Sequence, residues 1–395
     1  MTTDTPPDPL APARLGPVTL RNRVIKSATF EGRTPEALVT QDLVDFHVEL
    51  GRGGVGMTTV AYLAVAPEGR TERRQLWWRP EALPGLRELT DAVHATGAKV
   101  SAQIGHAGPV SDSRSTGLQS IAPSRRFDQM ALGTGLDRAA TRDDIDRIVR
   151  AHAQAASWAV EVGFDAVEVH LGHNYLASSF LSPRLNRRRD EFGGSLEHRA
   201  ELPRRIVTAV REAVARAGDD VAVLAKLNMD DGARGGLAPA ESLAFAKLLE
   251  ADGNLDALEL TGGSSLLNPM YLFRGDVPLT EFARTQHPLI GLGLRWFGGV
   301  LFKRYPYHPL YFLELARAFR AELALPLVLL GGVTDLGGMN TAMAEGFEFV
   351  GMARALLREP DLITKLRADA GTESACIHCN LCVPTIYERT VCPLT

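Results

Sequence analysis

Cysteine is scarce in this chain of 395 residues, and the few cysteines are confined to one end of it. They fall within the last 20 residues, at Cys376, Cys379, Cys382 and Cys392. A disulfide framework needs cysteines distributed over the chain that it staples. Clustering at one end is typical instead of a metal or cluster site in a reducing compartment. We therefore expect a cytoplasmic protein.

Long hydrophobic runs are absent as well. No stretch approaches the roughly 18 uninterrupted apolar residues that a membrane-spanning helix needs, so we expect no integral membrane segment. The first residues, Met1-Thr-Thr-Asp-Thr-Pro-Pro-Asp-Pro9, have neither the positive region nor the apolar region of a secretory signal. Both absences agree with the expected cytoplasmic location.

Positive charge is not in excess. Lys and Arg number 43 against 47 Asp and Glu, which gives a net charge of -4. A nucleic-acid partner requires a positive face for its phosphates, so we expect none. With 45% apolar and 23% charged residues, the chain has the composition of an ordinary soluble protein with a sizeable core. We expect a small-molecule substrate and a homo-oligomer.

Short apolar segments alternate with helical patterns along the whole chain. The expected strands are Val24–Ala28, Val55–Val60, Ala98–Gln103, Ala166–Val169, Val221–Lys226, Ala257–Leu260, Leu327–Leu330 and Phe347–Gly351. The expected helices are Gln41–Leu50, Glu81–Thr96, Arg142–Val162, Leu196–Ala217, Pro239–Ala251, Pro309–Leu323 and Leu336–Ala344. Strands without polar alternation are buried on both faces, which in this order indicates a parallel sheet. No Gly-x-Gly-x-x-Gly follows an early strand, so we expect an α/β fold with a single (β/α)8 TIM barrel.

Three side chains able to exchange protons follow the fourth expected strand. His170, His173 and Tyr175 come directly after that strand, at the end where the residues of a parallel barrel face the active site. Farther on, Ser195 is the expected N-cap of a helix that begins near Leu196. An isolated His-x-x-His is more often a pair of histidines that satisfy each other beneath a loop.

A longer sequence match around these residues favours a functional role over this structural interpretation. The motifs His170-x-x-His-x-Tyr-Leu176, Phe180-Leu-Ser-Pro183, Asn186-x-Arg-x-Asp-x-Phe-Gly-Gly-Ser195 and Arg199 resemble the old yellow enzyme family of FMN-dependent ene-reductases. The resemblance implies that His170 and His173 donate hydrogen bonds to the oxygen of the substrate's activating group. It implies that Tyr175 protonates the substrate carbon.

The same resemblance implies an FMN site at the strand ends. Its expected residues are Ala28, Thr29, Ala61, Gln103, Lys226, Gly331, Gly332, Ala353 and Arg354. In the family the residue at Thr29 tunes the flavin, Gln103 bonds the pyrimidine edge, and a cation at position 226 lies near N1. The glycines and the Ala353-Arg354 pair cradle the phosphate.

Physical chemistry supports these roles independently. A fixed cation stabilises the negative charge of reduced flavin, and a phosphate needs free backbone N–H groups and an Arg. This chain departs from the family at two positions, Lys226 in place of Arg and Ala353 in place of Gly. Taken singly, Lys226 is equally well interpreted as a solvated strand end and the glycine pair as an ordinary turn.

Two segments lie outside the barrel pattern. Residues 264–308 form an insertion before the seventh strand, which we expect to line the substrate entrance. Packing against neighbouring helices, contact with a partner subunit and contact with a membrane surface are its alternatives, the membrane last. The cysteine tail resembles the Cys-x-x-Cys-Asn segment of 2,4-dienoyl-CoA reductase and trimethylamine dehydrogenase, which holds a [4Fe–4S] cluster. By spacing alone, a cluster, a zinc site and free thiols all remain open.

The chain is therefore expected to comprise an FMN-binding barrel over residues 1–370 and a cysteine-rich tail over 371–395. The resemblance implies reduction of an activated C=C bond of an enone, enoate or enoyl thioester, with NADH or NADPH as the reductant. Two alternatives remain open. One is an amine dehydrogenase or demethylase of the trimethylamine dehydrogenase type, and the other is a flavin-binding protein without turnover.

Overall fold

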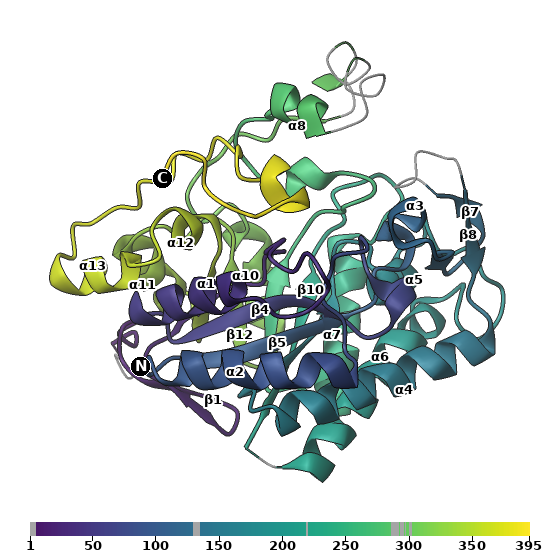
Figure 1. Cartoon of the computed structure of the whole chain (residues 1–395), viewed down its shortest axis with the longest axis horizontal. Coiled ribbons are helices and arrows are strands. Elements are labelled where there is room, and N and C mark those ends of the chain that lie inside the picture. The colour runs from purple at the N-terminus through teal and green to yellow at the C-terminus, as the bar shows by residue number, and fades with distance from the viewer. Residues whose placement is uncertain are drawn as a thin grey trace.

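The computed structural model describes residues 5–128, 135–218, 220–285, 292, 296, 298–299 and 302–395. Eight parallel strands close into a barrel, in the spatial order β10-β11-β12-β13-β3-β4-β5-β9, and helices surround it (Figure 1). The strands are β3 (Val24–Lys26), β4 (Met57–Ala64), β5 (Lys99–Gly105), β9 (Ala166–Leu171), β10 (Ala222–Asn228), β11 (Ala257–Thr261), β12 (Leu327–Leu330) and β13 (Phe349–Met352). The predicted TIM barrel is confirmed, and each of its eight strands overlaps a predicted one.

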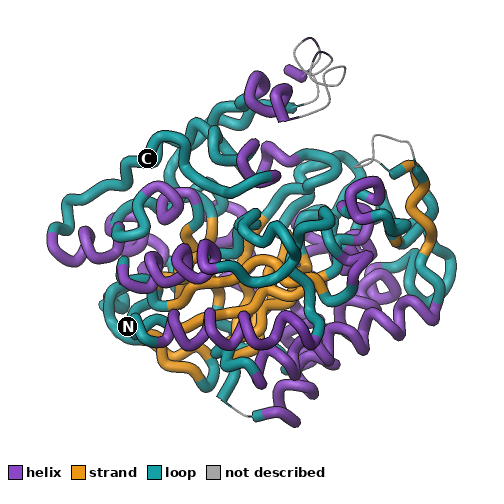
Figure 2. Tube along the Cα trace, viewed as in Figure 1, coloured by secondary structure: helices purple, strands orange, loops and turns teal. Residues whose placement is uncertain are grey.

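Helices cover the outside of the barrel (Figure 2). The longer ones are α1 (Gln41–Arg52), α2 (Leu83–His94), α4 (Arg142–Glu161), α6 (Leu196–Ala217), α7 (Pro239–Asp252), α10 (Leu313–Glu322) and α11 (Leu336–Ala344). The shorter ones are α3 (Ser113–Thr116), α5 (Leu176–Leu181), α8 (Leu279–Thr285), α12 (Arg354–Arg358) and α13 (Leu362–Ala368). Ser195 caps α6 as predicted, because its side chain accepts a hydrogen bond from the His198 N–H.

Some boundaries were predicted wrongly. We expected a helix from Pro309, but α10 begins at Leu313 because Leu310 adopts the left-handed φ of 51°. Strands β4, β5 and β10 each run at least two residues beyond their predicted ends. Element ends follow tertiary hydrogen bonds, which a local pattern does not contain.

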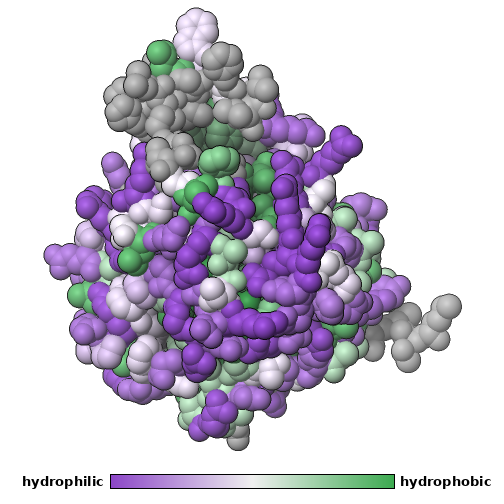
Figure 3. Space-filling model, turned by 90° about the vertical axis from the view of Figure 1, so that its right-hand side faces the viewer, coloured by the Kyte–Doolittle hydropathy of each residue, from purple (hydrophilic) through white to green (hydrophobic). Residues whose placement is uncertain are grey.

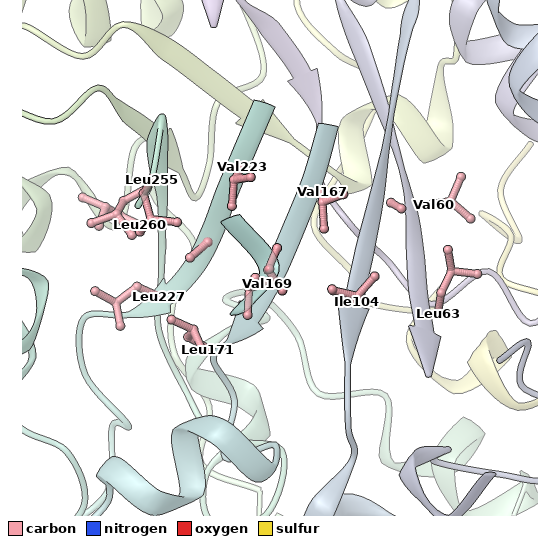
Figure 4. Packing of buried hydrophobic residues seen from close by; sticks show 14 of the residues in the cluster. Val60, Leu63, Ile104, Val167, Val169, Leu171, Val223, Leu227, Leu255 and Leu260 are labelled. Carbon is pink, nitrogen blue, oxygen red and sulfur yellow. The ribbon is translucent and has the colours of Figure 1, made fainter. Parts of the chain in front are cut away.

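The two faces of the strands are buried against different partners. Side chains on the outer face, such as Val167, Val169 and Val223, belong to a large apolar cluster between the strands and the helices (Figure 4). The inner face begins as a separate apolar cluster that includes Ala166 and Leu224. Burial on both faces explains why these strands lack polar alternation.

A short hairpin closes the floor of the barrel. Strands β1 (Ala13–Leu15) and β2 (Val18–Leu20) pair antiparallel, and their apolar residues join the inner cluster. The turn of the hairpin contains Gly16 at a φ of 55°, where a Cβ would collide with Asp256. The hairpin therefore seals the end of the barrel opposite the strand ends that carry His170 and Lys226.

A second small sheet lies in the connection between β5 and α4. It consists of β6 (Ile121–Ala122), β7 (Arg126–Phe127) and β8 (Leu136–Ala139). The side of the molecule seen in Figure 3 is largely hydrophilic, with hydrophobic residues in scattered patches. No helix in the described part of the chain combines the length and the hydropathy that a membrane span requires.

Candidate active site

His170, His173 and Tyr175 come together at the end of β9. The ring centroids of His170 and Tyr175 are 4.4 Å apart, and those of His170 and His173 are 5.2 Å apart. Tyr62, from the end of β4, adds a fourth ring, 5.2 Å from Tyr175. His170 is only 5% exposed, and its Nδ1 has no hydrogen-bond partner among the described residues. A buried polar atom without a partner is suited to a ligand group.

Both histidines are held neutral. Burial, followed by the nearby His173 and Lys226, lowers the pKa of His170 well below its ordinary value. Burial and then Lys226 lower the pKa of His173 to about 3. A neutral imidazole offers one N–H donor and one acceptor nitrogen. At pH 7 the pair therefore provides two hydrogen-bond donors without adding positive charge.

The turn that presents these groups is strained. His173 and Asn174 both adopt a φ of 59°, in the left-handed region that non-glycine residues rarely enter. Contacts from two other strand ends hold the turn in place. The His173 N–H donates to Asn228 Oδ1 at 3.1 Å, and His173 Nε2 lies 3.1 Å from Thr261 Oγ1. The imidazole is thus oriented by β10 and β11 as well as by its own strand.

Asp231 lies at the centre of the buried network beneath this turn. Its carboxylate accepts hydrogen bonds from Asn174 Nδ2 at 3.1 Å, Asn228 Nδ2 at 2.9 Å and Ser182 Oγ at 2.9 Å. Ser264 Oγ donates to the other end of the Asn174 amide. Burial raises the pKa of Asp231, because a carboxylate loses hydration in the interior. This network fixes the backbone on which His173 and Tyr175 depend.

Sequence reasoning missed Asn174, Asn228, Asp231 and Ser264. They follow three different strands and meet only because the barrel brings the strand ends together. The one local signal was Asn174, since Asn tolerates the left-handed conformation better than most residues.

Lys226 is not an isolated cation. It is 2% exposed, and its Nζ lies 2.9 Å from Glu259 Oε1 and 3.6 Å from Glu168 Oε1. Gln103 Nε2 donates to the same Glu168 oxygen at 2.5 Å. Burial opposes the charge of Lys226, but the two carboxylates outweigh it and raise its pKa. Gln103 and Lys226, which are two of the nine expected flavin residues, therefore belong to one buried polar layer of the barrel.

The inward side chains become more polar toward the carboxyl ends of the strands. On β9 the inward residues change from Ala166 to Glu168 to His170. On β10 they change from Leu224 to Lys226 to Asn228. The register places Lys226 opposite His170 on one side and opposite Glu259 on the other. This layering places an apolar plug beneath the charged layer, with the histidines above both.

The expected flavin residues on the first two barrel strands fall into a neighbouring group. Ala28 and Tyr175 pack against an apolar cluster that contains Ala61 and Tyr62. The Ala61 N–H donates to the Glu31 carboxylate, with Oε1 at 3.0 Å. Thr29 lies in the connection that follows β3.

The expected phosphate residues follow two adjacent strands. Gly331 and Gly332 follow β12, Ala353 and Arg354 follow β13, and these strands pair in parallel. The glycines adopt φ values of 107° and 85°, whereas Ala353 adopts -125°, so the Ala at this position carries no left-handed strain. Within the described residues, the N–H groups of Gly331, Gly332 and Ala353 donate no hydrogen bond. Free backbone donors at paired strand ends fit a phosphate group.

Arg354 extends toward the cysteine tail. Its guanidinium donates to the Arg274 carbonyl at 3.0 Å and to Asn380 Oδ1. Arg354 and the four cysteines line one narrow cavity of about 20 Å³. Burial raises the pKa of the Cys382 thiol to about 12. Despite the shared cavity, no group of three or more His, Cys, Asp or Glu side chains in the described part of the chain lies close enough to hold a metal ion.

The tail anchors part of the insertion. Asn380 Nδ2 donates to the carbonyls of Phe273 and Asp276 at 2.6 and 2.8 Å. The Arg274 guanidinium lies between 5.1 and 5.8 Å from the centroids of four aromatic rings. Helix α8 projects from the body on the side where the C-terminal segment lies (Figure 1). The described part of the insertion therefore packs against the tail. The expected substrate entrance and the membrane and partner-subunit alternatives stay predictions.

Comparisons with known proteins identify the family to which the whole chain belongs. The model of the NADH:flavin oxidoreductase / NADH oxidase family matches residues 10–259. The chain is 54% identical over 392 residues to the 4,4'-dithiodibutanoate disulfide reductase of Rhodococcus erythropolis, covering 99% of this chain and 96% of that protein. It is 30% identical over 381 residues to the NADH oxidase of Thermoanaerobacter brockii, covering 95% of this chain and 53% of that protein.

A solved structure supports the fold. The old yellow enzyme homologue from Zymomonas mobilis superimposes with a TM-score of 0.72 at 21% identity, covering 98% of each chain. A barrel with this strand order, a match of the family model over most of the barrel and a relative of nearly equal length lead to one assignment. The chain belongs to the NADH:flavin oxidoreductase / NADH oxidase family.

Proposed function

We propose that the protein is an FMN-dependent NAD(P)H reductase that reduces electron-poor C=C bonds of small molecules. The observation that carries this proposal is the grouping of neutral His170, neutral His173 and Tyr175 at the carboxyl edge of the barrel. Enones, enoates and enoyl thioesters are the substrate classes. When bound, FMN supplies a two-electron carrier that accepts hydride from NAD(P)H and delivers it to the β-carbon.

The chain's own residues supply orientation and a proton. His170 and His173 donate hydrogen bonds to the oxygen of the activating group, where negative charge develops as the β-carbon accepts hydride. Tyr175 delivers a proton to the α-carbon. One NAD(P)H and one proton are consumed per alkene, so the atoms and electrons balance. The strained, well-anchored turn keeps these groups in position before the substrate arrives.

The proposed FMN site uses the residues found at the strand ends. The free N–H groups of Gly331, Gly332 and Ala353 would hold the phosphate, and Ala28 and Ala61, which share an apolar cluster with Tyr175, would contact the flavin. Gln103 contacts the pyrimidine edge while Glu168 fixes its amide. Lys226, whose charge is partly balanced by Glu168 and Glu259, would supply the cation for the flavin. Thr29 and Arg354 complete the set.

The four cysteines are proposed to bind a [4Fe–4S] cluster, with zinc as the competing metal. The chemistry of four thiols that line one cavity supports a metal site, and the thiols have to move closer together to coordinate it. The metal would displace the thiol protons and lower the raised pKa values of Cys376 and Cys382.

Organic disulfides are a second candidate substrate. The specific observation is the relative that is 54% identical over nearly the whole of both chains and is named for its action on 4,4'-dithiodibutanoate disulfide. The same side chains suit this chemistry, because hydride transfer to one sulfur releases a thiolate from the other. Tyr175 then protonates that thiolate, so one disulfide, one NAD(P)H and one proton give two thiols.

Anaerobic rapid mixing of the FMN-loaded protein tests both candidates. Flavin bleaching by NADH or NADPH is followed first, and the reduced protein is then mixed with an enone, an enoyl thioester or an organic disulfide. Reoxidation by the alkene supports the main proposal, and reoxidation with thiol release supports the second. Bleaching by an amine without NAD(P)H would support an amine dehydrogenase, and no bleaching by either nicotinamide would support a flavin-binding protein without turnover.

The variant Tyr175→Phe examines the proton donor. We expect alkene reduction to slow by roughly 10² to 10⁴, the usual contribution of general acid catalysis, with flavin reduction by NAD(P)H nearly unchanged. Tyr271→Phe is the matched control, because Tyr271 lies in the insertion and its hydroxyl contacts Asp230 at 3.3 Å. An equal fall in both half-reactions would remove Tyr175 from the proposed role.

A further inference from the structure

An arginine-rich cavity lies beside the catalytic group and has no part in the mechanism above. It has a volume of about 730 Å³ and is lined by Arg70, Arg73, Arg74, Arg79, Trp77 and Glu36, among others. Its walls come from the connection after β4 and the connection after β3. Both connections leave the carboxyl ends of barrel strands, which is the edge that carries the catalytic residues.

The cavity wall is tied to the catalytic rings. Trp77 forms a bridge with Ala64 at the end of β4, and the Tyr62 hydroxyl donates to the Gly69 carbonyl at 2.7 Å. Trp77 and Tyr175 pack against the same apolar cluster, which contains Tyr62. One ring, Tyr62, therefore separates the proposed proton donor from the segment that carries the arginines.

Positive charge exceeds negative charge in the lining of this cavity. In the part of the chain that is described, no carboxylate lies within 4.0 Å of the Arg70, Arg73 or Arg74 guanidinium, whereas Arg79 has an ion pair of 3.7 Å with Glu81. Glu36 also lines the cavity, so its lining carries four positive charges and one negative charge. Burial, followed by repulsion from Arg79, lowers the pKa of Arg70, although attraction to Glu72 and Glu68 outside the lining partly opposes this shift. Gathering like charges costs free energy that an anionic ligand would offset.

The aromatic ring organises two of the arginines. The Arg79 guanidinium lies 4.9 Å from the Trp77 ring centroid and the Arg70 guanidinium 6.0 Å from it. Arg70 is held further by hydrogen bonds to the carbonyls of Pro67 at 2.8 Å and Arg73 at 2.7 Å. These backbone contacts fix the guanidinium without neutralising it. Arg73 and Arg74 are exposed and form the rim.

We propose that this cavity is an anion-binding subsite that holds a carboxylate or phosphate group of a reactant whose other end reaches Tyr175. Guanidinium groups bind both anions through paired, charge-assisted hydrogen bonds. The anion has two possible sources, a carboxylate of the acceptor or the phosphates of the nicotinamide nucleotide. The inference rests on the proposed reductase function, and it narrows the acceptors of that function to anionic molecules when the first source applies.

The test replaces the rim charges and leaves the rest of the cavity intact. The double variant Arg73→Gln/Arg74→Gln is compared with the control Arg216→Gln/Arg317→Gln, which removes two exposed arginines on α6 and α10. In the acceptor arm, kcat/KM is measured for a carboxylate-bearing enone and for its methyl ester. In the nucleotide arm, flavin reduction is measured with NADPH, with NADH and with 1-benzyl-1,4-dihydronicotinamide, which has no phosphate.

If the acceptor is the source, the rim variant loses roughly tenfold to 100-fold in kcat/KM for the acid and keeps its rate on the ester. If the nucleotide is the source, the loss appears with NADPH and NADH and is absent with the phosphate-free donor. Unchanged rates in both arms, or equal losses with charged and neutral reactants, would overturn the subsite.

A binding measurement separates this inference from the proposed function. Titration calorimetry of glutarate and of inorganic phosphate into the FMN-loaded protein needs no turnover. Binding that weakens about tenfold in the rim variant and persists in the control supports the subsite, even where no alkene or disulfide is reduced. Identical binding to both variants, or none to the wild type, counts against it.

Discussion

Two places in this molecule hold a His and an Asn in the left-handed conformation. At the turn after β9, called the catalytic turn for its proposed role, His173 and Asn174 both have a φ of 59°, and in the tail His378 and Asn380 have 58° and 59°. Both asparagines are buried, at 0% and 1% exposure. Their surroundings differ, because Asn174 is surrounded by buried polar side chains whereas Asn380 bonds mainly to backbone carbonyls of the insertion.

The buried polar groups of the catalytic turn are satisfied by the folded chain itself, whereas the thiols of the tail are suited to an added ligand. The donors and acceptors beneath the catalytic turn satisfy one another, with Asp231 at the centre. In the tail, four thiols share a cavity with one arginine, and burial raises the pKa of two of them. We infer that protein contacts alone position the catalytic turn, whereas a bound metal would organise the tail. Four perturbations test this comparison.

The substitution Asp231→Ala is expected to have the largest effect. It leaves the buried donors of Asn174, Asn228, Ser182 and the Leu237 N–H without their acceptor. We expect the free energy of unfolding to fall by about 3 to 5 kcal/mol, and acceptor reduction to collapse as the turn relaxes. Urea unfolding followed by circular dichroism measures the first, with the exposed Asp91→Ala as control. A loss under about 1 kcal/mol would mean that the turn is held by other contacts.

The pH dependence of stability tests the neutral state of His173. Its folded pKa of about 3 lies below the ordinary value of 6.5, so the unfolded chain binds the extra proton first as pH falls. The contribution is present in full above pH 6.5 and shrinks as pH decreases. Between pH 7 and pH 5 the wild type should lose about 2 kcal/mol more than His173→Gln. Parallel curves for the two proteins would show that His173 is protonated as easily in the folded state as in the unfolded one.

The barrel could be predicted because each strand is a short apolar run, and both faces of such a run are buried whatever its neighbours are. The grouping of His170, His173 and Tyr175 could be predicted because the three residues lie within six positions of one another in the sequence. Lys226 could be assigned to a strand end, but its pairing with Glu168 and Glu259 follows from the register between strands, which no local pattern contains. The hairpin β1–β2 escaped notice because strands of three residues give little periodicity.

For the tail, the sequence predicts which side chains could bind a metal but not how they are arranged. Spacing gives the order of the cysteines but not the path of the backbone at His378 and Asn380. The boundary at residue 370, the homo-oligomer and the cytoplasmic location stay predictions.

The third perturbation, Cys382→Ser, tests whether the tail binds a metal through this thiol. We expect protein purified anaerobically to contain iron and sulfide, or zinc, and the variant to lose most of it, because a serine hydroxyl is a poor replacement for a thiolate. Global stability should change by less than about 1 kcal/mol, since the cysteines lie outside the core clusters. Elemental analysis per chain decides this, and Ser242→Ala on helix α7 is the control. Equal metal content in both variants would exclude Cys382 as a ligand.

The smallest effect is expected from Asn380→Ala, which examines the tail without touching a thiol. The change removes the amide that bonds the carbonyls of Phe273 and Asp276, and it places Ala at a φ of 59°. Local opening of residues 371–382 should become about tenfold easier, a change of about 1.4 kcal/mol, while global unfolding stays the same. Hydrogen exchange read by mass spectrometry separates the two, and Asn254→Ala on the barrel is the matched control. If exchange rose across the barrel as well, the tail would be part of the cooperative fold and would resemble the catalytic turn in this respect.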